Sequence, residues 1–405
     1  MKYSNSLKYM NGFPGAGAMS EISSKRVLEL CFALGKVNVG LRCVCLPEGS
    51  AGHAVAVMLE SVIKCSGHSV GRITSVRRFD SRGSIYIDGE PPSIEDYNAA
   101  VAELKNAVKK NPDAGYTREE TTFVLGLLLC KMCGCEYVIL EGLSGKDYSL
   151  DSVCAPYDLI VMPTVYDSEG ASDKVKVLCD AIRRGTREVV SGNQKSEIYN
   201  AISNACAISG VRLYIPVKAQ FEVNEVTARK LTFSYSGRDG FMLKSPSYLL
   251  RDCAITVIES ALALRRGGVK LPWSDIISGL SAATDTFCFD MIAISPLLLV
   301  DSAASADEAA MLIKTAEEIL GENALKGAAI AIPEGAEDVK KAFSDKEISR
   351  AMVLSVDGGP YSFDSIKKLA CEIVKLWRSG TGVLCLGGPG FTSDIKNEIL
   401  KLMNG

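Results

Sequence analysis

Short apolar runs alternate with longer amphipathic segments along most of the chain. Runs typical of buried strands occupy 40–47, 136–142 and 157–165, and segments typical of helices occupy 54–67 and 173–185. Turns rich in Gly, Pro and Asp separate these units. Repeated strand–helix units of this kind predict an α/β fold with a doubly wound, mostly parallel sheet.

The stretch 220–246 has a different pattern. Apolar and polar residues alternate with a period of two around a Gly-Arg-Asp-Gly turn, which predicts an antiparallel addition to the parallel sheet. A long helical segment follows at 248–268, and a second series of strands and helices begins near Thr284. A chain of 405 residues exceeds what one hydrophobic core usually organises. We therefore expect two domains, 1–283 and 284–405.

Composition narrows the class of protein. Hydrophobic residues make up 47% of the chain and charged residues 23%, as in ordinary globular proteins. The net charge of −3 argues against a general nucleic-acid binder, which usually carries a strong basic excess. No uncharged apolar run is long enough to span a membrane, and the N-terminal stretch lacks the apolar core of a signal peptide. We therefore expect a cytoplasmic protein that binds neither nucleic acid nor membrane.

Cysteine and histidine limit the possible chemistry. Among the fourteen cysteines, Cys130, Cys133 and Cys135 form a CxxCxC motif that could supply three thiolates to zinc or to an iron–sulfur cluster. No fourth ligand is near in sequence, so buried thiols at a helix end are the favoured interpretation. The only histidines are His53 and His68, and neither has an obvious carboxylate partner in sequence. A Ser-His-Asp or Cys-His system is therefore not expected.

The stretch 43–63, CVCLPEGSAGHAVAVMLESVI, has the order of a P-loop: an apolar strand, a Gly-rich turn and a helix. A P-loop carries Gly-Lys-Ser or Gly-Lys-Thr at this turn, because the lysine binds the β- and γ-phosphates and the hydroxyl binds Mg²⁺. This chain has Gly52, His53 and Ala54 instead. The stretch is thus either a nucleotide site with altered chemistry, an eroded one, or a turn without a ligand.

The order of landmarks along essentially the whole chain resembles the folylpolyglutamate synthase/dihydrofolate synthase family, a branch of the Mur ligases. The residues that carry the resemblance follow the Gly-rich turn at intervals: Met58–Ser61, Thr74, Ser75, Gly89, Glu90, Ser93, Thr117, Glu120, Glu141, Gly145, Lys146, 189–194 and 278–280. The resemblance implies a P-loop ATPase-like domain over 1–283 and a smaller Rossmann-like domain over 284–405. Family members use Mg-ATP to activate a carboxylate as an acyl phosphate, which they join to an amino acid, usually glutamate.

The resemblance also implies which positions would form the site. Nucleotide-binding positions are Gly49, Ser50, Gly52, His53, Asp252 and Asp301; substrate-loop positions are Thr74, Ser75, Arg77, Arg78 and Lys146; and the metal ligand is Glu141. The implied ligands are Mg-ATP, if the protein is active, and a folate-like or peptide-like small molecule.

Several of these positions have a structural alternative. Glu141 is either a metal ligand or a solvated carboxylate. The arginines at 77, 78 and 82 either hold phosphates or belong to a solvated loop, and the loop is favoured. Asp301 either contacts a ribose or caps the next helix, and the cap is favoured because it follows from helix geometry alone.

Departures from the family fall on the catalytic positions. Besides the altered P-loop, Ser168 stands where the family has a magnesium-binding His, and Cys179 lies near the position of the often carbamylated Lys. In such a site, Mg²⁺ and lysine accelerate acyl-phosphate formation mainly by neutralising the negative charges of the carboxylate and the phosphates. The favoured hypothesis is a non-catalytic relative, without cofactor, retained as a binding protein or as the partner of another protein. The alternative is an active ATP-dependent carboxylate–amine ligase.

Overall fold

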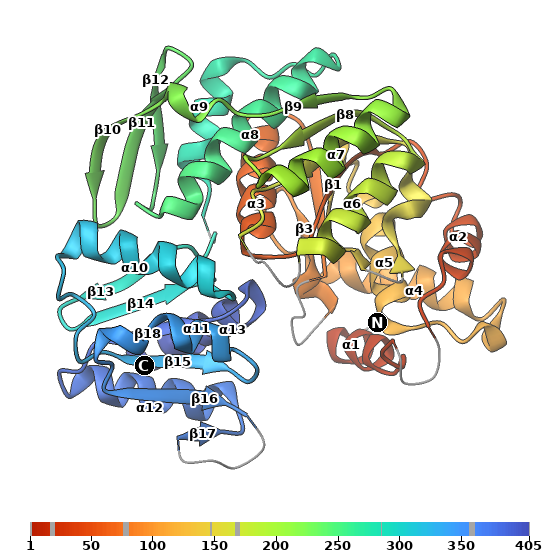
Figure 1. Ribbon diagram of the computed structural model, residues 1–405. Helices are drawn as coiled ribbons and strands as arrows, with labels where there is room; N and C mark the ends of the chain where they lie inside the picture. The colour runs from red at the N-terminus through yellow and green to blue at the C-terminus, as the bar shows by residue number, and fades with distance from the viewer. Residues whose placement is uncertain are drawn as a thin grey trace.

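The computed structural model describes residues 2–16, 21–75, 81–145, 148–166, 171–284, 286–355 and 361–404. Its helices and strands form two α/β units that lie side by side, with a small antiparallel sheet next to both (Figure 1). The predicted fold class, a mostly parallel doubly wound sheet with an antiparallel addition and a second, smaller α/β unit, is confirmed. The division at residue 283 stays a prediction. None of the helices in the described part of the chain is long and apolar enough to cross a membrane.

The first sheet has seven strands in the order β3-β2-β4-β1-β7-β8-β9. All neighbouring strands are parallel except β3, which is antiparallel to β2. The strands span Arg42–Leu46 (β1), Val70–Thr74 (β2), Ile85–Ile87 (β3), Tyr137–Glu141 (β4), Tyr157–Met162 (β7), Thr186–Ser191 (β8) and Arg212–Tyr214 (β9). A two-stranded hairpin, β5 (Ser144–Gly145) and β6 (Tyr148–Ser149), follows β4.

Helices cover both faces of this sheet and create two hydrophobic cores. One face carries α3 (Ser50–Cys65), α8 (Tyr248–Arg266) and α9 (Trp273–Ala282). The other face carries α1 (Tyr3–Asn11), α2 (Ser24–Ala33), α4 (Ile94–Val108), α5 (Arg118–Met132), α6 (Ala171–Arg184) and α7 (Ser196–Ser209). Because β1 is central and both of its faces are covered, the sequence around it reads as a continuous apolar run.

Local sequence determines where the helices begin. At the start of α5, the Thr117 hydroxyl accepts a hydrogen bond from the Glu120 N–H, and the Glu120 carboxylate accepts one from the Thr117 N–H. This capping box satisfies two N–H groups that no helical carbonyl could reach. Glu120 also pairs with Arg26 of α2 at 2.8 Å, so the cap fastens an N-terminal helix for which the apolar pattern gave no prediction.

The second sheet has six strands in the order β13-β14-β18-β15-β16-β17. They span Asp290–Ile294 (β13), Leu297–Asp301 (β14), Ala329–Pro333 (β15), Arg350–Leu354 (β16), Ser362–Phe363 (β17) and Val383–Leu386 (β18). The helices α10 (Ala306–Leu320) and α11 (Glu337–Ala342) pack on one face, and α12 (Ile366–Arg378) and α13 (Pro389–Asn404) pack on the other. The strand pattern missed β13 and β17, the strands at the two edges of the sheet.

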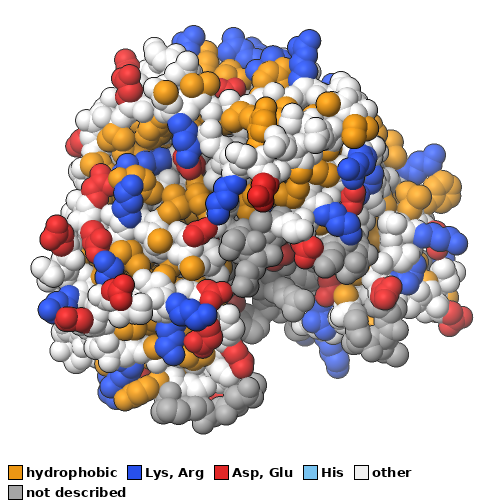
Figure 2. All heavy atoms as spheres, in the orientation of Figure 1, with side chains coloured by type: hydrophobic (Ala, Val, Ile, Leu, Met, Phe, Trp, Pro, Cys, Tyr) orange, Lys and Arg blue, Asp and Glu red, His pale blue; other side chains and the backbone are white. Residues whose placement is uncertain are grey.

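The antiparallel addition consists of β10 (Phe221–Thr227), β11 (Lys230–Tyr235) and β12 (Arg238–Leu243). Phe233 and Phe241 are fully buried where this sheet packs against α9 and α8. On the face shown in Figure 2, acidic and basic side chains are interspersed over most of the surface, as the small net charge of the chain suggests.

Candidate functional site

The Gly-rich turn connects the central strand β1 to α3, at the edge of the sheet where the parallel strands end. This is where open α/β sheets usually bind ligands. Gly49 has φ 129° and ψ 173°, a conformation that favours glycine. A Cβ atom on Gly52 would lie 2.3 Å from the Pro47 carbonyl oxygen, so only glycine fits there in this turn. The predicted strand, turn and helix are therefore all present.

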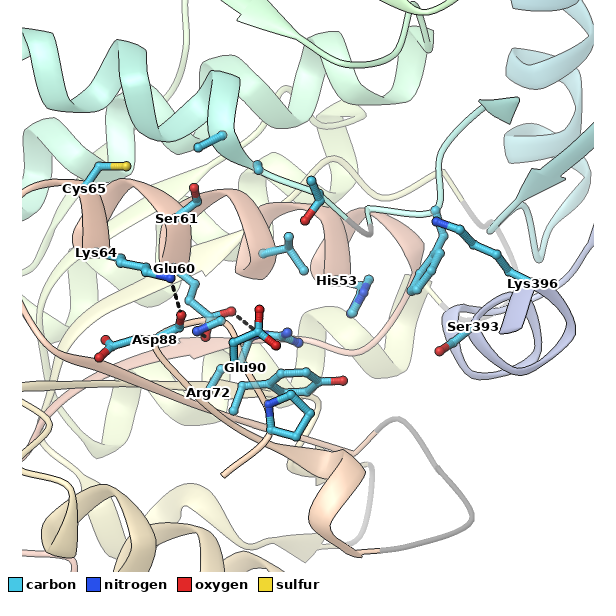
Figure 3. A pocket seen from close by; sticks show the side chains of 18 of the residues that line it. His53, Glu60, Ser61, Lys64, Cys65, Arg72, Asp88, Glu90, Ser393 and Lys396 are labelled. Atoms are coloured by element: carbon cyan, nitrogen blue, oxygen red, sulfur yellow. Dashed lines mark hydrogen bonds and ion pairs between the residues drawn. The ribbon is translucent and has the colours of Figure 1, made fainter. Parts of the chain in front are cut away.

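His53, in the first turn of α3, joins a buried ion-pair network with residues of β2 and β4. Figure 3 shows His53, Glu60 and Arg72 of this network. Its Nδ1 lies 2.9 Å from Oε1 of Glu141. The other carboxylate oxygen of Glu141 accepts a hydrogen bond from Nη1 of Arg72 at 3.2 Å, and Arg72 Nε donates to Glu60 at 2.7 Å. Each of these four side chains is at most 5% exposed.

The charges of the network are compensated within the protein. Burial alone would raise the pKa of Glu141, but the neighbouring His53 and Arg72 outweigh it and lower this pKa to about 2. Burial alone would lower the pKa of Arg72, and the carboxylates of Glu60 and Glu141 outweigh it and raise that pKa. The alternative that Glu141 is a solvated carboxylate is wrong, since the residue is 1% exposed.

Glu141 is poorly placed to hold Mg²⁺. Both of its carboxylate oxygens are engaged by nitrogen atoms of His53 and Arg72, which a metal ion would have to displace. Among the described residues, no group of three or more His, Cys, Asp or Glu side chains is arranged to hold a metal ion. The donor set that the structure shows therefore does not fit a resident magnesium site.

The concave side of the turn is almost filled. The Ser50 hydroxyl donates a hydrogen bond to the Ser302 carbonyl oxygen at 2.5 Å and lies 3.3 Å from Oε2 of Glu308, at the start of α10. The hollow bordered by the turn, the end of β7, Lys174 and Glu308 has a volume of about 20 Å³. A space of this size holds about one water molecule.

The two aspartates of the nucleotide-site prediction are engaged elsewhere. Asp301 accepts hydrogen bonds from the N–H groups of Phe289 and Ala303 at 2.6 and 2.8 Å. Burial raises the pKa of Asp301 to about 7, although these two hydrogen bonds lower it. The expectation that Asp301 caps the next helix is wrong, because Ser305 is the N-cap of α10. Asp252 accepts a hydrogen bond from the Tyr166 hydroxyl at 2.6 Å and forms an ion pair with Lys218 at 2.8 Å.

A larger cavity of about 370 Å³ lies beside the turn, at the ends of β2 and β4. Thr74 and Ser75 line it together with Glu48, Arg118 and Thr122. The Ser75 hydroxyl is buried and has no hydrogen-bond partner within the described part of the protein. The wall of the cavity thus includes a buried polar group without a partner among the described residues. The other predicted substrate-loop residues, at positions 77, 78 and 146, lie outside the described residues.

A second cavity, of about 350 Å³, lies between α3, the turn after β3, and α13 (Figure 3). Its floor is the ion-pair network of His53, Glu60 and Arg72, and Lys396 of α13 forms part of its wall. The ring of Phe287 stacks on His53 with centroids 5.6 Å apart, and the Lys396 ammonium lies 5.6 Å from the same ring. Phe287, in the segment that joins the two sheets, therefore covers the His53 side of the network.

Two of the three CxxCxC cysteines are buried at the helix end, as predicted, and the third is not. Cys130 is fully buried, Cys135 is 6% exposed, and Cys133 is only partly buried. A hydrogen bond to Cys135, together with burial, raises the pKa of the Cys130 thiol. A raised pKa disfavours the thiolate form that metal ions bind.

Sequence reasoning found the turn, Thr74, Ser75 and Glu141, and the structure brings all of them to one edge of the sheet. It missed Arg72 and Glu308. The sequence does contain a signal for Arg72: an arginine inside an apolar strand is buried, and a buried charge usually pairs with an opposite charge such as a carboxylate. Nothing in the sequence connects Glu308 with Ser50, which is 258 residues away.

Comparisons with known proteins bear on the fold of the chain. No protein-family model matches the chain. Folylpolyglutamate synthase of Lacticaseibacillus casei is 24% identical over 344 residues, which cover 80% of this chain and 78% of that protein. The apo form of the L. casei enzyme superposes with a TM-score of 0.78 at 19% identity, covering 99% of this chain and all of the other.

Two further solved structures are similar. A complex of folylpolyglutamate synthase with AMPPCP and folate has a TM-score of 0.79 at 17% identity, with 99% and 100% of the two chains covered. The Thermotoga maritima folylpolyglutamate synthase has a TM-score of 0.75 at 16% identity, with 98% and 96% covered. The fold is thus that of the folylpolyglutamate synthases of known structure. In sequence, the chain is similar to the L. casei enzyme over most of both chains.

Proposed function

We propose that this chain is a non-catalytic folylpolyglutamate-synthase-like protein that binds a small molecule and does not run the ATP-dependent ligase reaction. The observation that carries the proposal is the closed turn between β1 and α3. Its concave side has room for about one water molecule, and the Glu308 carboxylate borders it where a nucleotide would bring phosphates.

The electrostatics of the site support the same conclusion. Acyl-phosphate formation brings a carboxylate onto a phosphate, so the protein has to supply positive charge. Here His53 and Arg72 direct their nitrogen atoms to Glu141 and Glu60, deep in the protein. Removing a single preorganised electrostatic contact typically costs about 10²–10³-fold in rate, so the loss of several would leave little ligase activity.

The cavity at Ser75 supports a retained binding role. Its volume, about 370 Å³, is within the usual range for small-molecule sites. It has a buried, unsatisfied hydroxyl and the charged side chains of Arg118 and Glu119 in its wall. A folylpolyglutamate synthase of the same fold has been solved in complex with folate. A folate-like or peptide-like molecule is therefore the class of ligand to test first.

The alternative is an active ATP-dependent carboxylate–amine ligase. It is favoured by the likeness over nearly the whole chain to a folylpolyglutamate synthase solved with AMPPCP and folate. On this alternative, the turn opens when Mg-ATP binds and Glu141 leaves its ion pairs.

Thermal unfolding in the presence of ligands separates the two functions. We expect no change in Tm with up to 5 mM Mg-ATP, and a rise with a folate or a folyl-glutamate that binds the cavity. A ligand at 100 times its Kd stabilises by about 2.7 kcal/mol, which raises the Tm of a protein of this size by about 3–5 °C. The L. casei enzyme is the positive control.

The variant Ser75→Ala tests the cavity, because it removes the unsatisfied hydroxyl without adding volume. It should weaken binding of the cavity ligand and leave the Tm of the free protein nearly unchanged. A rise in Tm with micromolar Mg-ATP, followed by glutamate-dependent phosphate release, would establish the ligase alternative instead.

A further inference from the structure

The CxxCxC motif lies at the C-terminal end of α5, where the chain turns back toward β4. Gly134 has φ 71°, and the N–H groups of Gly134 and Cys135 donate to the carbonyl oxygens of Lys131 and Cys130 at 3.2 and 2.8 Å. These two hydrogen bonds define a Schellman motif, in which the residue after the glycine packs against a residue of the last helical turn. In α5 both residues of that contact are cysteines, Cys130 and Cys135.

Other helices of the chain end with the same pair of hydrogen bonds but without a pair of thiols. In α7 the two contact positions hold Cys206 and Val211, and in α8 they hold Leu264 and Val269. An apolar pair is the usual composition of this contact. The two cysteines of α5 meet the same packing need, and they add a chemistry that the other pairs lack.

The sulfur atoms of Cys130 and Cys135 lie together against Gly71 of β2. Both are within 3.5 Å of the position that a Cβ atom on Gly71 would take, and the Cys130 thiol is hydrogen-bonded to Cys135. With standard bond lengths, the backbone hydrogen bond between the two cysteines keeps their Cα atoms within about 7 Å, which is the upper limit for a disulfide. The local backbone is therefore compatible with a bond between these sulfur atoms.

Cys133, the middle cysteine of the motif, is not part of this contact. It is the C-cap residue of α5 and is only partly buried. Burial and the nearby carboxylate of Asp96 raise the pKa of its thiol, which indicates that the thiol lies toward α4 and not against Gly71. The structure thus separates one pair from the third cysteine.

We propose that Cys130 and Cys135 form a dithiol that hydrogen peroxide oxidises to a disulfide within the chain. Cys135 is 6% exposed and Cys130 is fully buried, so the oxidant reaches Cys135 first. The Cys135 sulfur attacks a peroxide oxygen and becomes a sulfenic acid, and one water molecule leaves. The Cys130 sulfur then attacks the sulfenic sulfur, forms the S–S bond and releases the second water molecule.

The overall step is balanced, because two thiol protons and two electrons pass to the peroxide, which becomes two water molecules. The disulfide closes a ring of six residues over the end of α5, and thiol reagents restore the dithiol by exchange. This modification site goes beyond the proposed function, because it requires neither a nucleotide nor a cavity ligand.

Peptide mapping of the full chain tests the proposal, because trypsin cleaves after Lys131, between the two cysteines. The folded protein is treated with hydrogen peroxide, unfolded in the presence of N-ethylmaleimide to block the remaining thiols, and digested without reductant. We expect the peptides 119–131 and 132–146 to remain joined, with two hydrogen atoms fewer than the separate peptides. Dithiothreitol should separate them.

Two cysteines serve as internal comparisons within the same digest. Cys385 of β18 is as buried as Cys130 but belongs to no such contact, so it should carry N-ethylmaleimide. In the joined peptides, fragmentation should place N-ethylmaleimide on Cys133 and none on Cys135. This measurement locates the bond without any substitution.

Variants give an independent check. Cys133→Ser should leave the joined peptides in place, whereas Cys135→Ala should abolish them. Separate peptides at every peroxide concentration at which the protein stays folded would overturn the proposal. A bond between Cys130 and Cys133, or joined peptides that persist in Cys135→Ala, would overturn it as well.

Discussion

The two histidines of the chain provide an internal comparison between a buried and an exposed ion pair. His53 faces Glu141 at 2.9 Å with both side chains 2% exposed, whereas His68 faces Glu136 at 3.1 Å with side chains 19% and 54% exposed. We predict that Glu141→Gln strongly destabilises the protein at neutral pH. Glu136→Gln, the matched control, should have almost no effect.

The magnitude follows from the pKa of Glu141, which the network lowers from 4.5 to about 2. A group with a lowered folded pKa contributes stability that is present above its unfolded pKa and is lost as the pH falls through the folded value. The shift corresponds to about 3 kcal/mol, similar to the usual cost of breaking a buried pair. An exposed pair such as His68–Glu136 is worth about 0–1 kcal/mol.

Fluorescence-detected urea unfolding between pH 2 and 8 provides the assay. Trp273 and Trp377 are the only tryptophans, and Trp273 lies on α9, which packs against α3. In a Trp377→Phe background the signal therefore reports the part of the protein that contains the network. The native protein should lose stability as the pH falls from about 4.5 to about 2, and Glu141→Gln should lose less over this range.

Equal stability of Glu141→Gln and Glu136→Gln at pH 7 would refute this reasoning. So would a rise in Tm with millimolar Mg²⁺ that Glu141→Gln abolishes, because that result would make Glu141 a metal ligand and not an ion-pair partner.

Two further predictions concern stability. Burial raises the folded pKa of Asp301 to about 7, so the stabilising contribution of its protonated carboxyl is complete below pH 4 and is lost as the pH rises through 7. The free energy of unfolding of Asp301→Asn should lack this decline of up to about 4 kcal/mol. Parallel pH profiles of the variant and the native protein would contradict the assignment. A Cβ atom on Gly279 would lie 2.4 Å from the Cα atom of Val62, so Gly279→Ala should force α9 away from α3 and cost about 1–3 kcal/mol in urea unfolding. Gly388→Ala, where a Cβ atom meets nothing within 4 Å, is the control, and equal stabilities would show that the α3–α9 contact adjusts freely.

On the proposed function, a fold is retained without its chemistry because its polar site positions have partners inside the protein. His53 contacts Glu141, which also pairs with Arg72, and Ser50 donates to a carbonyl oxygen next to the second sheet. Such contacts keep buried polar groups satisfied in the absence of a ligand.

Much of the fold could be predicted from the sequence because it depends on local patterns. Strands such as β1 and β15 are apolar runs bounded by turn residues, and helices such as α5 begin at a capping box, so neighbours in sequence suffice to identify them. The same patterns do not predict α1 and α2, whose positions depend on hydrogen bonds with residues about one hundred positions further along the chain.

The candidate site divides in the same way. The sequence alone determined that a Gly-rich turn follows a buried strand, that its lysine is absent, and that Glu141 ends another strand. Only the tertiary structure decided that Glu141 faces His53 and Arg72, and that Glu308 reaches the turn from the second sheet. The physical reason is that the periodicity of side chains sets local conformation, whereas the partner of a buried charge is set by how distant elements pack.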